Sequence, residues 1–317
     1  MSMNTGNSDL LIRSELWSNQ MKEELLDELQ AMKYVRWLQE FPDGNTFTIP
    51  SIGQAVVDDY VEDAPVKYRA LDTGEFQFTI TDYVSSGHYI TKKARQDLFY
   101  ASQLEAGFVP KEHRAIMTHV ESKILALASA GPGNQTLADL NNINGAPHRW
   151  VAGGSNQIMT VNDFAKARYS LKKANVPDTD LVAIVDPSVE FTLNTMTNLV
   201  NVSNNPQWEG IVSSGIATGM RFVKNVYGFD VYTSNYVDDL ANETIDSVAS
   251  VAGKANLFFS AAPGDTLPFV GAWRQMPEVD SQYNQDFQRE EYVTTARYGV
   301  KVYRPENLVV VISEVHV

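Results

Sequence analysis

Apolar side chains recur every three or four positions between Ser14 and Met32, and acidic side chains fill the other face of the same stretch. This spacing predicts an amphipathic helix. Its apolar stripe consists of Trp17, Met21, Leu25, Leu29 and Met32. A Pro-Asp-Gly turn signal follows at 42–44, so we expect the helix to end before residue 41.

The period changes to two between residues 46 and 91, which is typical of β-strands. The pattern predicts an outgoing arm at 46–52 and 55–71, a turn at 72–74 and a returning arm at 75–84. Two paired arms of about 19 residues make a ribbon roughly 60 Å long. Because an isolated two-stranded ribbon buries too little surface to be stable, it must lie on something else.

The next segments predict helices that could support this ribbon. A short helix is expected at 91–103 and a long one at 110–131, with Pro110 at its start. Ile116, Val120, Ile124 and Leu127 form its apolar stripe, and Gly131-Pro132 ends it. With a length of roughly 30 Å, it is the expected spine of the scaffold.

Beyond a loop at 131–157 the pattern becomes α/β. We expect a helix at 160–176, a buried strand at 180–185 leading into a helix at 188–196, strands at 229–237 and 255–262, and two strands around Arg304-Pro305 within 290–312. In the helix at 160–176, the inward residues are Val161, Phe164, Ala165 and Leu171.

Composition excludes several kinds of function. The chain of 317 residues has 25 Lys and Arg against 39 Asp and Glu, a formal charge of −14, which disfavours sequence-independent affinity for nucleic acid. The absence of cysteine excludes disulfides, thiolate zinc sites and cysteine nucleophiles, and it suits a reducing cytoplasm. Apolar runs such as 308–312 are far shorter than the roughly 20 residues of a membrane helix. We therefore expect a soluble, unexported chain without membrane contact.

The candidate for catalysis is Asp186, which follows a buried strand at the position where α/β enzymes place acids. The same residue also fits a helix N-cap, with Pro187 at the first helical position. The capping interpretation is favoured because it explains both residues.

Metal and cofactor sites find little support. His119 and Glu121 resemble half of a zinc deaminase motif whose cysteines are missing, and His113 lies six positions from His119, not the three or four that share a helical face. The carboxylates Asp58, Asp59, Glu62 and Asp63 lack the ligand pattern of a calcium loop, which favours a solvated or partner-facing stretch. We expect no catalytic, cofactor or metal site.

The order of these segments resembles the major capsid protein of tailed bacteriophages, the Hong Kong ninety-seven shell fold that encapsulins share. The resemblance extends from about residue 14 to residue 312, and its most specific parts are 89–97, 162–193, 228–237 and 298–312. It implies an α+β fold with an N-terminal arm (1–45), an extended β-hairpin loop (46–92), a peripheral domain with the spine helix (93–132 and 263–317) and an α/β axial domain (133–262).

The resemblance also implies a function and its partners. Hexamers and pentamers of the chain are expected to close into an icosahedral phage head around double-stranded DNA, assembled in the host bacterial cytoplasm. Because only about 45 residues precede the ribbon, we expect a separate scaffolding protein and a portal, and a cement protein is a further candidate partner. Packaged DNA is expected inside without specific binding, since like charge lets the genome slide.

Intersubunit contacts are expected from the ribbon, through Tyr60, Lys67, Tyr68, Arg69, Asp72, Phe76 and Phe78. The N-terminal helix is expected to pack through Trp17, Met21, Leu25 and Leu29, either on a neighbouring copy or on its own spine helix. Gly53 and Gly87 are the hinge candidates where the ribbon leaves the body.

Three other interpretations remain open at this point. An encapsulin-type compartment has the same fold with a different content. A soluble α/β enzyme using Asp186 belongs to a different class, and so does a tail or decoration protein.

Overall fold

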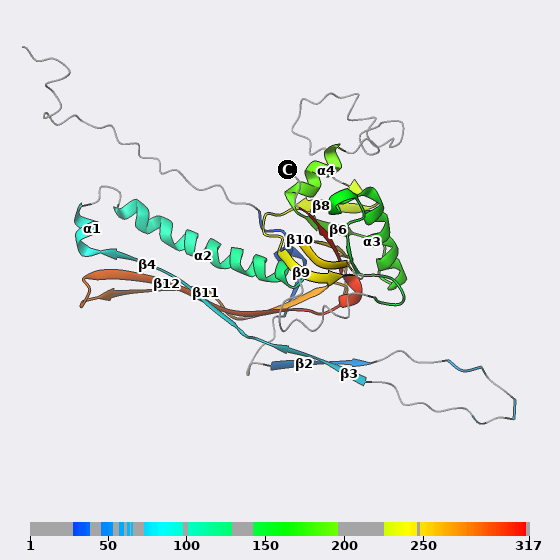
Figure 1. Ribbon diagram of the computed structural model, residues 1–317. Helices are drawn as coiled ribbons and strands as arrows, with labels where there is room; N and C mark the ends of the chain where they lie inside the picture. Colours follow the sequence, from blue (N-terminus) through cyan, green and yellow to red (C-terminus); the bar gives the residue numbers. More distant parts are fainter. Residues whose placement is uncertain are drawn as a thin grey trace, which may run out of the picture.

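The computed structural model describes residues 28–38, 46–52, 57–59, 62–63, 65, 73–97, 101–128, 142–195, 225–245 and 248–314. The predictions on Trp17, Met21, Leu25, Gly53, Tyr60, Lys67, Tyr68, Arg69 and Asp72 lie outside these residues. Figure 1 shows a long arm, a compact lobe at one end of it, and a hairpin that projects away from both.

The helices are α1 (Lys92–Asp97), α2 (Ala101–Ala126), α3 (Val161–Lys173) and α4 (Pro187–Thr195), with short 3-10 helices η1 (Ala31–Tyr34), η3 (Ser155–Gln157) and η5 (Pro305–Asn307). The strands are β1 (Val35–Leu38), β2 (Thr46–Ile52), β3 (Thr73–Thr79), β4 (Asp82–Thr91), β5 (Arg149–Val151), β6 (Leu181–Val185), β7 (Asn225–Val226), β8 (Phe229–Thr233), β9 (Asp239–Ile245), β10 (Val248–Ser260), β11 (Phe269–Asn284), β12 (Arg289–Val302) and β13 (Val309–Ser313).

The arm consists of a four-stranded sheet, in the order β1-β11-β12-β4, with α2 along one face (Figure 1). The predicted stripe of α2 faces inward, since Ile116, Val120 and Ile124 are buried. However, α2 begins at Ala101, so the prediction that Pro110 starts the helix is wrong. Proline removes one backbone hydrogen bond from the helix, and the packing of α2 on β4 and β12 keeps the helix continuous through this position.

Strand β11 was not predicted, although it is the longest strand of the arm. Its first four residues are buried, but from Trp273 onward its side chains are at most half-buried. Both faces of this strand are partly exposed to solvent, so its sequence lacks the alternation of apolar and polar residues that predicts a strand. Pro277 also argued against a strand here, because proline is disfavoured inside sheets. Its pairing with β12, rather than its composition, makes this segment a strand.

The lobe is a second sheet, in the order β5-β13-β10-β6-β8-β7, with β9 paired to β10. The rings of Phe164 on α3, Phe229 on β8 and Phe258 on β10 meet edge to face in its core, with centroids 5.1–6.4 Å apart. The predicted α3, β6, α4 and β13 are confirmed, whereas β5 and β9 were not predicted.

Asp186 caps α4, as the capping interpretation proposed. Its Oδ2 accepts hydrogen bonds from the backbone N–H and the hydroxyl of Ser188, at 3.0 and 2.6 Å. Pro187 is the first helical residue. The carboxylate is therefore explained by the helix end that it closes.

His148, fully buried between the bridge at Ala146 and strand β13, supplies a pH prediction. Burial lowers the pKa of His148, and the hydrogen bond to the Ala146 carbonyl opposes this only in part. The unfolded chain therefore takes up the proton at higher pH, so the stability that neutral His148 provides falls as the pH drops below about 6.5 and through the lowered pKa. We expect urea unfolding midpoints to decrease over this window, and to decrease less in His148→Gln. Parallel pH profiles for the two proteins would contradict this.

Candidate functional site

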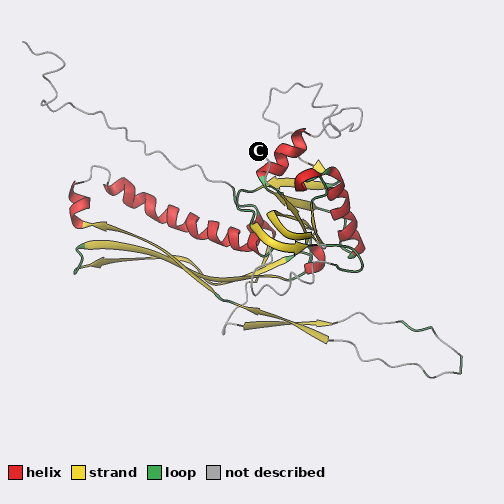
Figure 2. Ribbon diagram, in the orientation of Figure 1, coloured by secondary structure: helices red, strands yellow, loops and turns green. Residues whose placement is uncertain are grey.

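The projecting hairpin is formed by β2 and β3, which pair antiparallel from Thr46 opposite Thr79 to Ile52 opposite Thr73. Figure 2 shows the two strands extending beyond the arm. The predicted turn at 72–74 is wrong, because Thr73 and Gly74 belong to β3, and the described turn lies at Glu62–Asp63 instead. The paired part that the structure describes spans seven residues in each strand, and most of the remaining predicted length, 53–72, lies outside the described residues. We call residues 46–79 the ribbon.

The ribbon is anchored to its own arm by a small apolar cluster, which we call the ribbon base. Phe78 and Ile80 are buried there with Val270 and Ala272, and the half-buried Leu38, Phe76 and Tyr303 pack against them. Phe78 has 0% of its surface exposed. Its expected contact with a neighbouring copy thus differs from the structure, in which its ring is already covered by β11.

Phe76 also contacts its own chain. Its ring meets Tyr303 edge to face at 5.1 Å, and the ammonium of Lys301 lies 5.1 Å from the ring centroid. The same ammonium donates a hydrogen bond to the carbonyl of Gln77, at 3.1 Å. The apolar stripe of the returning arm therefore orients the ribbon on the subunit that carries it.

Glycines decide where the ribbon leaves the body. A Cβ on Gly299 of β12 would lie 3.1 Å from Ile80 Cα and from the Thr79 carbonyl oxygen, so the absence of a side chain at residue 299 lets the ribbon lie close to this strand. Gly87, in contrast, sits in the middle of β4 opposite Val293. The structure thus places Gly87 inside a sheet, and the break between β3 and β4 falls at residues 80–81.

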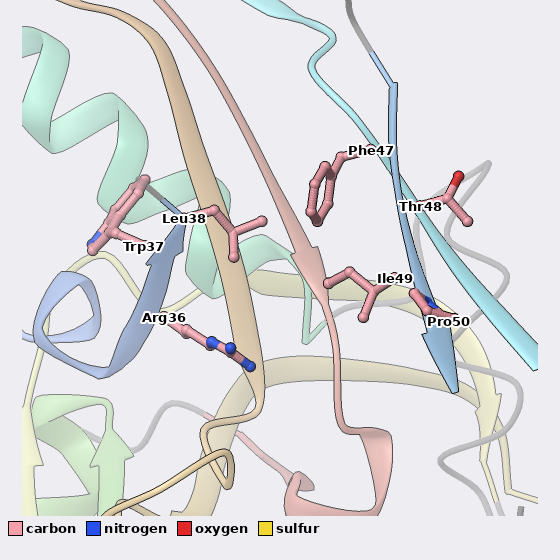
Figure 3. Close-up of a pocket in the computed structure, with 7 residues that line it drawn as sticks. All are labelled: Arg36, Trp37, Leu38, Phe47, Thr48, Ile49 and Pro50. Atoms are coloured by element: carbon pink, nitrogen blue, oxygen red, sulfur yellow. The ribbon is translucent and has the colours of Figure 1, made fainter. Parts of the chain in front are cut away.

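A pocket of about 440 Å³ lies between β1 and β2 at the ribbon base. Figure 3 shows its seven lining residues: Arg36, Trp37, Leu38, Phe47, Thr48, Ile49 and Pro50. Phe47 and Ile49 point from β2 toward the arm, whereas Thr48 points away (Figure 3). Alternation along β2 therefore gives the ribbon one face toward its own body and one face that is free for other contacts.

Two surfaces of the described chain expose side chains relevant to contact with another molecule. On the ribbon, Glu75, Gln77 and Thr79 are exposed, as are the predicted carboxylates Asp58, Asp59, Glu62 and Asp63. On the arm, Tyr83 and Tyr89 of β4 are 65% and 59% exposed. The register places both on the sheet face away from α2, because the neighbouring pair Ser86 and Thr294 lies on the α2 side, where Thr294 bonds Glu112. We call this the outer sheet face.

A buried carboxylate ties the N-terminal part of the described chain to α2. Oε1 of Glu121 accepts hydrogen bonds from the backbone N–H groups of Gln30 and Ala31, at 2.8 and 2.7 Å. Oε2 accepts one from Met32, at 2.9 Å. Burial raises the pKa of Glu121, although these hydrogen bonds oppose the shift. Sequence reasoning considered Glu121 only as part of a metal motif and missed this role.

The amphipathic helix predicted for residues 14–32 can be checked from residue 28 onward, and there the prediction is wrong. Residues 28–30 are not helical, and η1 follows, so Leu29 and Met32 do not continue an α-helical stripe. The reason is long-range: Glu121 holds the N–H groups that open η1, and β1 then pairs in parallel with β11. Leu29 is half-buried at this anchor.

The remaining candidates do not assemble into a chemical site. His113 and His119 are exposed on α2. In the described ranges, no group of three or more His, Asp or Glu side chains is arranged to hold a metal ion. No helix within the described part of the chain is long and apolar enough to cross a bilayer.

The fold matches solved phage capsids along nearly its whole length. The capsid structure of the cyanophage P-SCSP1u aligns with a TM-score of 0.72 and 13% identity, covering 98% of this chain and 95% of that chain. The cyanophage Pam1 capsid aligns with a TM-score of 0.71 and 13% identity, covering 99% and 98%. A chain from Mycobacterium phage Che8 aligns with a TM-score of 0.66 and 18% identity, covering 96% and 97%. The fold is therefore that of a capsid subunit.

A family model described as phage capsid protein matches residues 113–311, which is more than half of the chain. This chain belongs to the phage capsid protein family and is a structural major capsid protein. No curated protein matches the sequence. Membership implies assembly into a shell of capsid subunits and a place in the virion capsid. The encapsulin alternative is not favoured. The enzyme alternative rested on Asp186 as a catalytic acid, and the structure explains this residue as the cap of α4.

Proposed function

We propose that copies of this chain assemble as hexamers and pentamers into an icosahedral head around double-stranded DNA, and that each ribbon lies over a neighbouring copy. The observation that supports this is the ribbon itself, which is anchored at its base and projects away from the arm and the lobe (Figure 1). The outer sheet face, with Tyr83 and Tyr89 exposed, offers apolar area of the kind that such a ribbon needs.

Many modest contacts are enough for such a shell. Burying apolar surface contributes about 25 cal/mol per Å² before the cost of ordering is subtracted, so one ribbon contributes only a few kcal/mol. Each subunit of a closed shell repeats the contact around rings and between them. The summed interactions then resist the loss of any single subunit.

The finer assignments belong to the same proposal. We assign residues 1–45, 46–92, 93–132 with 263–317, and 133–262 to the N-terminal arm, extended loop, peripheral domain and axial domain. Assembly takes place in the host bacterial cytoplasm with a separate scaffolding protein and a portal, and a cement protein is a further candidate partner. The role is structural, with no catalytic step.

Shortening the ribbon tests the proposal. Because Ile52 pairs with Thr73, residues 53–72 can be replaced by Asn-Gly, which closes a tight hairpin without disturbing the ribbon base. We expect the variant to keep the unfolding midpoint of the full chain but to form no closed shells in negative-stain micrographs when it is expressed with its scaffold. Closed shells of normal size from the shortened chain would refute the role of the ribbon.

The ribbon is not expected to form covalent links. Some capsids join subunits through an isopeptide bond from a ribbon lysine, but Lys67 is the only lysine between residues 46 and 91, and the returning arm has none at its centre. Denaturing electrophoresis of mature particles should therefore show one band near the monomer mass of 35.3 kDa. A ladder of covalent multimers that disappears in Lys67→Arg would contradict this.

A further inference from the structure

Between Pro110 and Ala126, the acidic residues of helix α2 are buried, whereas both of its lysines are exposed. Its two carboxylates in this stretch, Glu112 and Glu121, are both fully buried. Glu112 Oε1 lies 2.7 Å from His88 Nδ1 on β4, and Glu121 holds the N-terminal segment. The acids are thus engaged within the body and leave the other side of the helix without negative charge.

The opposite side carries a row of exposed residues at intervals of four, namely Lys111, Ala115, His119 and Lys123. Residues at this spacing lie above one another on a helix. The ammonium of Lys111 has no ion pair or hydrogen bond with the described residues. Lys123 is 46% exposed, and its nearest carboxylate oxygen, on Asp82, is 4.0 Å away. We call these four residues the α2 row.

The cations of α3 provide a contrast within the same chain. Asp178 lies 2.6 Å from Arg168 and 2.8 Å from Lys172, and the Lys166 ammonium lies over the Trp150 ring at 4.4 Å. These charges are already engaged by their own subunit. The two lysines of the α2 row are therefore less compensated than these three cations of α3.

We propose that the α2 row faces the interior of the shell and contacts the phosphates of packaged duplex DNA, an inference that rests on the proposed function. In that assembly a neighbouring ribbon covers the outer sheet face. The opposite face of the arm, which carries α2, then faces the interior of the shell that holds the DNA. Exposed Glu278 and Asp280 lie on β11, away from the row. Cations on the helix side match a polyanion in charge.

The residue types favour DNA over an amphipathic helix as the occupant. A helix such as the one predicted at the N-terminus needs an apolar groove for its stripe, and the α2 row contains Ala115 as its single apolar side chain. Small Ala115 lets a phosphate backbone approach between the flanking lysines. Two or three contacts per subunit are weak and sensitive to salt, so the genome remains free to slide despite them.

Lysine acetylation in intact particles tests this inference. Acetic anhydride is applied to DNA-filled heads and to heads emptied of DNA, and the modification of each lysine is measured by mass spectrometry. We expect Lys111 and Lys123 to be several-fold less modified in filled heads. The controls Lys172 and Lys173, both exposed on α3, should react equally in the two particles.

A second measurement compares the double variant Lys111→Gln/Lys123→Gln with Lys172→Gln/Lys173→Gln. In opened shells, the slope of log affinity for a duplex oligonucleotide against log salt should shrink by about two in the first variant, since each phosphate contact contributes about 0.9. The second variant should keep the slope of the unmodified protein.

The outcomes separate this inference from the proposed function. If no closed, DNA-filled particles form, the proposed function fails. If filled heads form and Lys111 and Lys123 react as they do in emptied heads, only the DNA contact is refuted. Protection that persists in emptied heads also refutes it, because a protein segment then covers the row, for example the acidic residues 23–28.

Discussion

Replacing Glu121 by alanine is expected to destabilise the subunit by about 3 kcal/mol or more, because each buried N–H left without an acceptor costs about 1–3 kcal/mol. Three N–H groups depend on this one carboxylate, two of them buried on Gln30 and Ala31 and one half-buried on Met32. Loss of the anchor should also release β1 from β11. Urea unfolding of unassembled subunits measures the first effect, and faster amide hydrogen exchange at residues 30–38 measures the second.

Two further variants show whether this loss is specific. In Glu121→Gln the amide oxygen can still accept from Gln30 and Ala31, whereas its NH₂ group faces the N–H of Met32, so a smaller loss is expected.

The charge of the Glu121 carboxylate adds a second difference between Glu and Gln at this position. Because burial raises the pKa of Glu121, the pH-dependent part of its contribution to stability is fully present below about pH 4.5 and is lost as the pH rises through the raised value. Gln has no such pH dependence. Exposed Glu278→Ala is the matched control, and an equal loss there would refute the anchor.

Replacing Phe78 by alanine is expected to cost about 3–5 kcal/mol, the usual range for removing a fully buried aromatic side chain. The ring fills the ribbon base against Val270 and Ala272. Its loss leaves a cavity at the point that orients the ribbon, so we also expect fewer closed shells at equal amounts of folded subunit. Unfolding midpoints and particle counts in micrographs measure the two effects, and exposed Gln77→Ala is the neighbouring control.

A variant that creates no cavity separates the effect on the stability of the subunit from the effect on the orientation of the ribbon. A Cβ on Gly299 would lie 3.1 Å from the backbone of residues 79–80 and 3.2 Å from the Phe78 ring, so it presses on the ribbon base without removing a side chain from it. We expect Gly299→Ala to impair shell closure as well. If Phe78→Ala and Gly299→Ala both assemble normally, the ribbon base does not control assembly.

The elements that were predicted correctly are those whose cause is local. Residues 181–185 form a continuous apolar run, and all five are buried in β6. Asp186 and Pro187 follow it, and both the cap and the helix start are satisfied by residues within a few positions. Helix α3 likewise shows its inward face by spacing alone, with Phe164 and Leu171 buried. Such features need no knowledge of distant segments.

The failures share the opposite property. The ribbon turn was placed at 72–74 because Asp-Thr-Gly is a local turn signal, but pairing with β2 draws Thr73 and Gly74 into a strand. Gly87 was expected where the ribbon leaves the body because glycine is permissive, but pairing with Val293 places it inside β4; its role as a hinge stays a prediction. In both cases a partner far away in the sequence overrode the local preference.

The amino-acid sequence by itself determined α3, β6, α4 and β13 of the lobe, the inner stripe of α2 and the resemblance to a capsid subunit. Only the tertiary structure decided that Phe78 packs on its own arm, that Glu121 anchors the N-terminal segment, and that β11 pairs along its length with β12. The physical reason is that periodicity reports which side chains avoid water. It does not report which surface covers them, because that depends on contacts between residues far apart in the chain.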